Sequence, residues 1–367
     1  MFNIPMKRNT RILMILTSLI MGSCNSPMPD HLAVRTQVDT IGFVQYSWQM
    51  DSIIARIKRT RVMGKFPDSI DHQPWKVSIS PHDDYTYVGS LYTQVLQQVE
   101  ANTLLLIGVA HKAGELDLED RIIFDSHTHW KGPYGEIRVS ELREEIIEKL
   151  DRTLFEVNDS MHRIEHSLEA LIPFLQYFNP GLEIIPVLVP YMSFSRMDSI
   201  AIGFSDVLLS VLTGHNLDWG KDFAIVITTD AVHYGDEEWG GKNYAPFGCD
   251  STGNAKAVEH EYRIINRSLT GDLSIDKIRI FNQFTVQESD YREYKWTWCG
   301  RYSVPFGLLA AYYLQENNIG QGPLEGSLIG YSNSIDHEHI YVDDLHMGRT
   351  AVATPHHWVG YAAIGFR

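Results

Sequence analysis

The 367-residue chain lacks the short motifs that mark several large enzyme classes. It has no P-loop, no dinucleotide-binding glycine fingerprint and no serine-nucleophile elbow. Basic residues are not clustered. The 31 lysines and arginines are outnumbered by 46 aspartates and glutamates, which gives a formal net charge of −15. We therefore expect an acidic protein without a nucleic-acid partner. Neither an internal repeat nor a break in composition is present, which favours one domain.

Apolar runs long enough to span a bilayer are also missing near the N-terminus. The run from Ile12 to Met21 is too short to cross a membrane. Three basic residues precede it and a Gly-Ser-Cys sequence follows it, which is the pattern of a signal peptide over residues 1–23. Cysteine after Gly-Ser resembles a bacterial lipobox, although Met21 stands where leucine is usual. The leader predicts export and a lipid anchor to the membrane through Cys24, on the periplasmic or cell-surface side. An ordinary secretory signal is the alternative.

Cysteine is scarce, with three in the whole chain. If Cys24 belongs to the leader, Cys249 and Cys299 remain in the mature protein. Two cysteines in an exported protein could form a disulfide. Two free thiols with separate roles are the alternative, which we favour for Cys299.

The apolar runs that do occur follow an α/β pattern. Four of them have the composition of buried strands: Val77 to Ser80, Thr103 to Ala110, Glu183 to Val189 and Phe223 to Thr229. Between the first two, residues 89–100 carry apolar side chains at helical spacing, so the three segments predict a βαβ unit with neighbouring parallel strands. We expect a tether at residues 24–40 and then one α/β domain over 41–367, with a central mixed, largely parallel sheet flanked by helices.

The other elements are predicted from the same periodicities. Helices are expected near residues 41–65, 141–152, 167–178, 197–212, 253–269 and 304–315, and short strands near 122–125, 136–139, 278–284, 328–333 and 359–366. Pro173 lies inside the third of these helices, so that helix is bent or begins later than its pattern suggests.

Polar side chains follow the predicted strands at their carboxyl ends. His82 comes after the first strand, His111 after the second, and Asp230 with His233 after the fourth. Ligands of open α/β sheets bind beyond this edge. Two imidazoles there suggest a metal ion. A single histidine at a strand end is more often a loop or hydrogen-bonding residue.

Eight segments, in order along the chain, resemble the landmarks of the Memo family, also called AmmeMemoRadiSam system protein B. They read PHDDYTYVG (81–89), LLIGVAHKAG (105–114), WKGPYGEIRV (130–139), EHSLEALIPFLQ (165–176), IIPVLVP (184–190), TTDAVHYG (228–235), CGRYSVPFGLLAA (299–311) and VGYAAIGF (359–366). The family resembles class III extradiol dioxygenases in fold. The resemblance implies an α/β sheet with a metal pocket at one end.

The resemblance also implies the site residues. The family's two-histidine, one-cysteine metal set matches His82, His111 and Cys299. Asp230, His233 and His166 match positions that line the same pocket, and Arg301 follows the cysteine in the shared CGR. This chain departs from the family at Asp83 and Asp84, where a small pair is usual, at Ala110, where a second histidine is usual, and at Tyr302 and Ser303.

The chemistry of these groups suggests roles for them. A His₂Cys set suits copper, zinc or iron, and leaves coordination positions open. A bound metal would deprotonate Cys299. His233 could act as a general base oriented by Asp230, His166 as a second acid or base, and Arg301 as a binding group for a substrate carboxylate or a superoxide-like anion.

Each assignment has a structural alternative. Cys299 could be a small core residue, Asp230 the N-cap of a following helix, His233 a packed loop residue and Arg301 an ion-pair partner. We expect His127, His129, His337 and His339 to be loop or surface histidines. Asp83 and Asp84 could add charge near a cation or face solvent, and Tyr85, Tyr87, Tyr234 and Trp298 could line the pocket or only pack beside it.

Three functions remain open. The first is a copper- or iron-dependent redox enzyme that acts on a small molecule or an oxygen species. The second is a metal-binding or interaction protein without turnover, and the third is a zinc-dependent hydrolase. The resemblance implies a pathway link to radical-SAM and AMMECR-type proteins. A lipid anchor outside the cytoplasm conflicts with that link.

Overall fold

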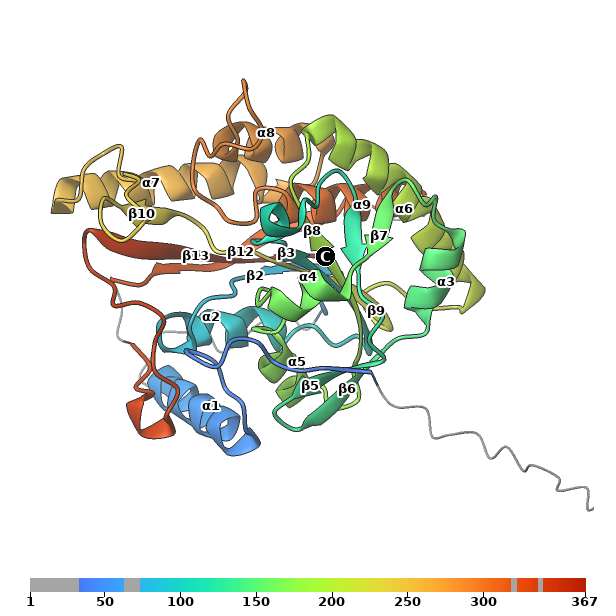
Figure 1. Ribbon diagram of the computed structural model, residues 1–367, viewed down its shortest axis with the longest axis horizontal. Coiled ribbons are helices and arrows are strands. Elements are labelled where there is room, and N and C mark those ends of the chain that lie inside the picture. Colours follow the sequence, from blue (N-terminus) through green and yellow to red (C-terminus); the bar gives the residue numbers. More distant parts are fainter. Residues whose placement is uncertain (1–32, 63–72, 318–321, 336–338) are drawn as a thin grey trace, which may run out of the picture. The chain divides into compact units, whose positions relative to one another are not determined.

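The structure is a computed structural model that describes residues 33–62, 73–317, 322–335 and 339–367 (Figure 1). The predicted signal peptide and most of the predicted tether lie outside the described residues, as does His337. Strand β1 (Val34–Arg35) falls within the segment predicted as a tether. The Arg35 side chain is buried there and forms an ion pair with Glu169.

One mixed sheet runs through the domain, as the sequence predicts. Its four central strands are mutually parallel, in the order β8 (Glu183–Val189), β3 (Thr103–Val109), β9 (Phe223–Thr228) and β2 (Val77–Ser80). Beyond β2 the strands β13 (His357–Phe366) and β12 (Glu325–Asn333) pair antiparallel. Other strands extend or border the sheet: β4 (Ile122–Phe124), β5 (His129–Gly132), β6 (Gly135–Val139), β7 (Phe155–Val157), β10 (His233–Gly235) and β11 (Gly271–Asp272).

The prediction that the first two strands are neighbours is wrong, because β9 lies between β2 and β3. All six residues of β9 are buried, and their side chains alternate between the two hydrophobic cores on opposite faces of the sheet. A strand that is apolar on both faces fits the centre of a parallel sheet best. Its insertion brings Thr228 beside the His82 ring and Asp230 beside the His82 backbone.

Helices cover both faces of the sheet (Figure 1). One side carries α3 (Leu142–Lys149), α6 (Phe194–Gly214), α7 (Ser251–Ser268), α8 (Ile275–Thr285) and α9 (Ser303–Asn317). The other side carries α1 (Ser47–Val62), α2 (Tyr85–Leu96) and α5 (Ile172–Phe178). The short α4 (Asp159–Ile164) contacts β4. Two turns of 3₁₀ helix, Ala113–Leu116 and Asp343–Leu345, complete the described elements.

Two helices differ from the sequence prediction. Residues 278–284 form part of α8, not a strand. Ser274 accepts a hydrogen bond from the Lys277 amide and caps this helix, and its buried residues Ile278 and Phe281 are three positions apart. Helix α5 begins at Ile172, so Pro173 lies in its first turn, where proline is tolerated.

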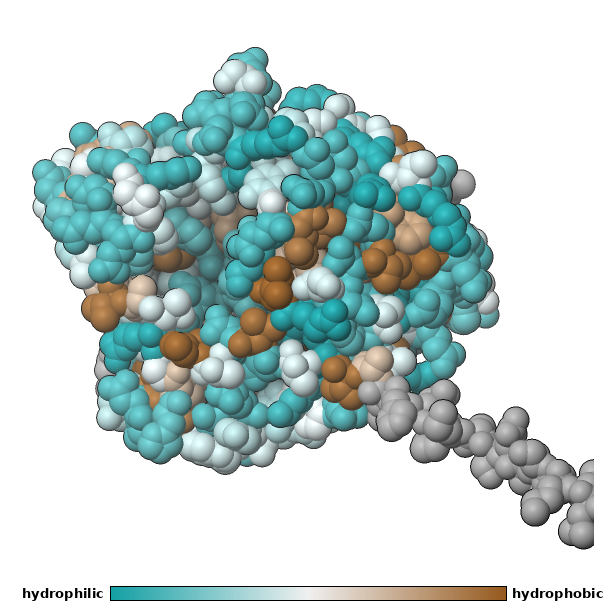
Figure 2. Space-filling view, viewed as in Figure 1, coloured by the Kyte–Doolittle hydropathy of each residue, from teal (hydrophilic) through white to brown (hydrophobic). Residues whose placement is uncertain are grey.

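The surface seen in Figure 2 is mostly hydrophilic, with hydrophobic residues in small separate groups. Among the described helices, α6 is long and apolar enough to cross a membrane. It packs against α9, and its buried residues include Met197, Phe204 and Leu208, which is the pattern of a core helix.

Candidate metal centre

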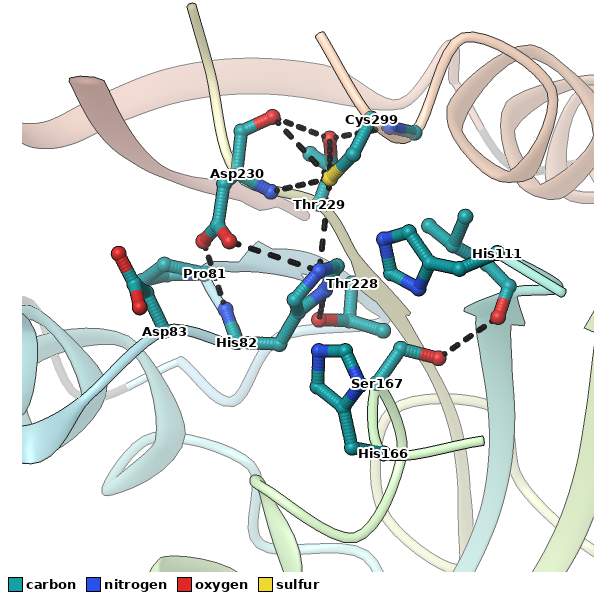
Figure 3. Close-up of polar contacts among 12 residues, drawn as sticks. Pro81, His82, Asp83, His111, His166, Ser167, Thr228, Thr229, Asp230 and Cys299 are labelled. Atoms are coloured by element: carbon teal, nitrogen blue, oxygen red, sulfur yellow. Dashed lines mark hydrogen bonds and ion pairs between the residues drawn. The ribbon is translucent and has the colours of Figure 1, made fainter. Parts of the chain in front are cut away.

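His82 lies at the centre of the candidate site, directly beyond the end of β2 (Figure 3). Its Nδ1 is 2.9 Å from the Thr228 hydroxyl oxygen, and its backbone N–H donates to Asp230 Oδ1 over 2.9 Å. Its Nε2 lies 3.4 Å from Cys299 Sγ and 3.4 Å from Asp230 Oδ2. The ring is therefore fixed through Nδ1, and Nε2 faces the thiol and the carboxylate.

Cys299 reaches His82 from the loop that precedes α9. The fully buried Glu261 accepts hydrogen bonds from the indoles of Trp296 and Trp298 in this loop. It also accepts one from the Val232 amide, and so joins the loop to the segment after β9. The Asp230 amide donates to Cys299 Sγ over 3.0 Å. Burial raises the pKa of the Cys299 thiol well above its usual value, so the thiol keeps its proton until a cation replaces it.

A glycine allows this loop to approach β9 closely. The Gly300 amide donates to Thr229 Oγ1 over 2.9 Å, and a Cβ atom at residue 300 would lie 2.3 Å from that oxygen. No larger residue fits without moving the loop. The thiol is therefore held by tightly packed backbone.

His111 and His166 form the other side of the site and share one carboxylate. Glu165 accepts from the His111 amide over 2.7 Å and lies 2.9 Å from His111 Nδ1. It also accepts from the amides of His166 and Ser167 over 3.0 and 2.9 Å. Burial would raise the pKa of Glu165, but His111 and the other contacts hold it well below its ordinary value of 4.5. The carboxylate is therefore ionised and keeps Nε2 of His111 free.

The three imidazoles face one another (Figure 3). The ring centroids of His111 and His166 are 5.0 Å apart and stacked, and the ring of His82 stands edge-on at 5.2 Å from His111. Candidate ligand atoms of His82, His111 and His166 all lie within 4.8 Å of one another, and so do those of His82, Asp230 and Cys299. His82 belongs to both groups, whereas His111 and Cys299 belong to different ones.

The donors fit a transition metal ion. Imidazole nitrogen and thiolate sulfur suit copper, zinc and iron. The Nδ1 atoms of His82 and His111 are engaged by Thr228 and Glu165, as the remote nitrogens of metal-binding histidines usually are. The described residues thus hold candidate ligand groups for a metal. The particular set His82, His111 and Cys299 stays a prediction.

A cavity of about 260 Å³ opens beside these groups. The predicted residues His82, His111, His166, Asp230 and His233 line it, whereas Cys299 and Arg301 do not. The remaining lining consists of acidic, aromatic and small residues: Asp83, Asp84, Tyr87, Trp239, Ser334, Thr350, Ala351, Ala353, His357, Trp358, Val359 and Tyr361. No lysine or arginine is among these lining residues. Of the aromatic residues expected near the pocket, Tyr85, Tyr234 and Trp298 do not line the cavity and are buried in the core.

Burial controls the charge of this cavity. Partial burial and the neighbouring His111 lower the pKa of His166 to about 4 and that of His233 to about 3, so both imidazoles are neutral near pH 7. Burial and the nearby Asp83 raise the pKa of Asp84 to about 7. The same two causes raise the pKa of Asp230 well above its ordinary value. Asp84 does not face solvent, because it is 1% exposed and accepts hydrogen bonds from Thr350.

The surroundings of Asp230 and His233 bear on the structural alternatives for these two residues. Asp230 caps no helix, because the strand β10 follows it. The His233 ring stacks on Trp239 at 5.3 Å, and Trp239 also stacks on His357 at 4.1 Å. With a pKa of about 3, His233 takes up a proton poorly and is better suited to hydrogen bonding or metal binding.

Arg301 is buried in an aromatic cage away from the cavity. Its guanidinium carbon lies 3.4 Å from the ring centroid of Tyr294, and Nη2 donates to the Arg292 carbonyl over 2.8 Å. No ion pair forms with a described carboxylate, and the Nε and Nη1 atoms lack hydrogen-bond partners among the described residues. The ion-pair alternative is therefore not found, and anion binding stays a prediction.

Other predicted features are placed as follows. Cys249 and Cys299 are both free thiols, so the disulfide alternative is not found. His127 lies in the loop between β4 and β5, as expected, but is buried there, with its Nδ1 3.1 Å from Asp125. The sequence reasoning missed Glu165, although it stands beside His166 in the segment EHS. Trp239 and His357 gave no signal, because the fold alone brings them to the cavity.

Comparison with known proteins matches this sequence to one family. The sequence model described as Memo-like protein matches residues 44–345. The chain belongs to the Memo-like family. A MEMO1 family protein of Pyrococcus furiosus is 24% identical over 270 residues, which cover 70% of this chain and 80% of the relative. One from Thermococcus kodakarensis is 26% identical over 302 residues, or 79% and 86% of the two chains. One from Aquifex aeolicus is 31% identical over 162 residues, or 43% and 54%.

Proposed function

We propose that this Memo-like protein is a metal-dependent redox enzyme that holds copper or iron through His82, His111 and Cys299. The single observation that carries the proposal is the approach of Cys299 Sγ to His82 Nε2 at 3.4 Å, next to the His111 ring and the cavity. Thiolate with imidazole favours these metals over magnesium or calcium. When bound, such an ion would supply one-electron chemistry to a small molecule or to an oxygen species.

The protein's own groups would bind and orient the substrate. Three carboxyl groups, of Asp83, Asp84 and Asp230, line the cavity, and aromatic rings form much of the remaining wall. Since no basic side chain stands among the lining residues, the cavity favours a neutral or cationic small molecule over a carboxylate. Asp230 lines the cavity and could hold or move a proton there, because burial and the nearby Asp83 favour its protonated form.

The group of three imidazoles favours a second candidate function. Three histidines hold zinc in some hydrolytic and hydrating enzymes and leave a position for water. The ligand atoms of His82, His111 and His166 lie within 4.8 Å of one another. Zinc-assisted hydrolysis would then depend on His166 and not on Cys299.

Oxygen consumption by the metal-loaded protein tests the redox proposal. The substrates would be a panel of neutral and cationic aromatic amines and phenols, compared with matched carboxylic acids. We expect turnover with copper or iron that is lost in His82→Ala and retained in His129→Ala, a histidine outside the cavity. Turnover that survives His82→Ala would refute the redox proposal. Equal activity on the carboxylic acids would refute the proposed preference for neutral or cationic substrates.

We also propose that the protein is exported and anchored by a lipid on Cys24, on the strength of its leader sequence. Metabolic labelling with a fatty acid should mark the protein, and Cys24→Ser should abolish the label. An unlabelled wild-type protein would contradict the anchor. The link to radical-SAM and AMMECR-type proteins stays an expectation.

A further inference from the structure

A second cluster of potential metal ligands lies outside the cavity, on the segments next to β10, β13 and α7. Figure 1 shows these three elements on the same side of the domain. The cluster consists of Asp236, Cys249 and His356, whose ligand atoms all lie within 4.8 Å of one another. His356 Nδ1 is 2.7 Å from Asp236 Oδ1, and the Cys249 thiol donates to the same oxygen over 3.2 Å. Three different donors from three separate segments thus converge on one point.

The strand pairing brings two of the donors together. Gly235 pairs with His357 in the antiparallel ladder of β10 and β13, and the Asp236 amide donates to the His356 carbonyl over 3.1 Å. Gly235 has φ +140°, and a Cβ atom there would lie 1.9 Å from the His356 carbonyl oxygen. Glycine is therefore required for this approach.

The third donor is fixed by the loop that leads into α7. The Tyr234 hydroxyl donates to the Gly248 carbonyl over 2.9 Å, and the Asn254 side chain donates to the Cys249 carbonyl over 3.2 Å. A Cβ atom at residue 253 would lie 2.2 Å from the Gly248 oxygen, so a second glycine permits this packing. The position of Cys249 is thus set by hydrogen bonds on both sides.

We propose that Asp236, Cys249 and His356 form a second metal site, for a divalent ion of the zinc class. Zinc binds thiolate at about 2.3 Å and imidazole or carboxylate at about 2.0–2.2 Å, which places tetrahedral donors about 3.3–3.6 Å apart. The observed separations of 2.7 and 3.2 Å need only a small opening. Thiolate and carboxylate together balance the two positive charges, and the imidazole is neutral.

Binding at this site is an exchange of protons for the metal. The Cys249 thiol loses its proton to solvent, and its sulfur binds the ion. His356 gives up the Nδ1 proton that it donates to Asp236, keeps its other ring nitrogen protonated, and binds the ion through Nδ1 as a neutral imidazole. The hydrogen bonds to Asp236 are replaced by a bond from Asp236 to the same ion. Burial and Asp236 raise the pKa of Cys249 to about 11, so without a metal the thiol keeps its proton. The side chains of His356 and Asp236 are 48% and 39% exposed, which leaves solvent access to a fourth position.

The site differs from the candidate metal centre in its place and ligands. His357 and His233 line the cavity, whereas the adjacent His356 and the nearby Asp236 do not. The inference goes beyond the proposed function and does not depend on it. The two centres use different cysteines, so each can be removed separately.

Cobalt binding to a protein with one remaining cysteine tests the proposal. In Cys24→Ser/Cys299→Ser, the remaining cysteine is Cys249, because the sequence has three. We expect one equivalent of Co²⁺ to produce a cobalt–thiolate charge-transfer band. Adding Cys249→Ser should abolish the band, and Asp236→Asn or His356→Ala should weaken binding at least tenfold, whereas the matched control His129→Ala should not.

A measurement on the wild-type protein covers the case in which the cysteine variants fold poorly. Zn²⁺ should protect Cys249 from alkylation by iodoacetamide, as mapped by mass spectrometry, and a chelator should reverse the protection. The absence of a cobalt–thiolate band in folded Cys24→Ser/Cys299→Ser would overturn the proposal. Alkylation of wild-type Cys249 at the same rate with and without Zn²⁺ would overturn it as well.

Discussion

The two sides of the candidate metal centre are built in different ways. On the thiol side, Cys299 and Asp230 are 3% and 4% exposed and are held by packed backbone. On the imidazole side, the His111 and His166 side chains are 27% and 32% exposed, and both residues contact the same carboxylate of Glu165. The comparison indicates that the thiol side is part of the core, whereas the imidazole side is set by one buried charge and faces the cavity.

The largest effect is expected from removing that charge. Glu165→Ala leaves four N–H groups without their acceptor, those of the His111 ring and of the amides of His111, His166 and Ser167. We expect the free energy of unfolding to fall by about 3–5 kcal/mol and metal affinity to fall by about 10–100-fold. Urea unfolding and metal titration measure the two losses. A protein that keeps both properties would show that Glu165 does not organise this side.

The pH dependence of stability gives a separate check on Glu165. Its pKa in the folded protein lies below the ordinary value of 4.5. The stabilisation is therefore complete above pH 4.5 and is lost as the pH falls below that value. We expect Glu165→Gln, which cannot ionise, to be less stable at neutral pH and to lose less stability in acid. An acid profile parallel to that of the wild-type protein would contradict this assignment.

A smaller loss of stability is expected on the thiol side when its packing is disturbed. Gly300→Ala would place a methyl group 2.3 Å from Thr229 Oγ1, so the loop that carries Cys299 must move. We expect a loss of about 1–3 kcal/mol in the free energy of unfolding. The matched control is Gly181→Ala, where the nearest atom to an added Cβ is 3.7 Å away. Equal stability of the two variants would contradict tight packing on the thiol side.

The smallest effect is expected at Thr228, which supports His82 between the two sides. Thr228→Val removes the hydroxyl that lies 2.9 Å from His82 Nδ1 and preserves the shape of the side chain. We expect metal affinity to fall by about tenfold. Thr228→Ser keeps a hydroxyl and should bind metal nearly as the wild-type protein does. Equal affinities of the valine and serine variants would show that the hydroxyl does not orient His82.

The sequence predicted the strands of the central sheet better than their order. The bounds of β2 and β8 agree with the apolar runs, because a short buried strand is recognisable from its own residues. The place of β9 between β2 and β3 depends on contacts among distant segments, which periodicity does not encode. The error at α8 has a different cause, because the helical spacing of Ile278 and Phe281 is a local pattern that a short apolar run can hide.

The candidate site was predictable to a similar extent. Polar residues beyond the strand ends identified His82, His111, Asp230 and His233, and the structure brings all four to one cavity. The two ligand groups that share His82 were not foreseen, since they depend on side-chain positions. Arg301 was expected near the site from its place beside Cys299, yet its side chain extends towards Tyr294 instead.

Metal content tests the central claim most directly. Elemental analysis would compare Cys249→Ser, which lacks a donor of the second proposed site, with Cys249→Ser/Cys299→Ser and Cys249→Ser/His166→Ala. The account predicts one equivalent of copper or iron in the first protein, its loss when Cys299 is replaced, and its retention when His166 is replaced. Full metal content without Cys299 would contradict the account, and zinc that is lost only with His166 would support the three-imidazole site instead.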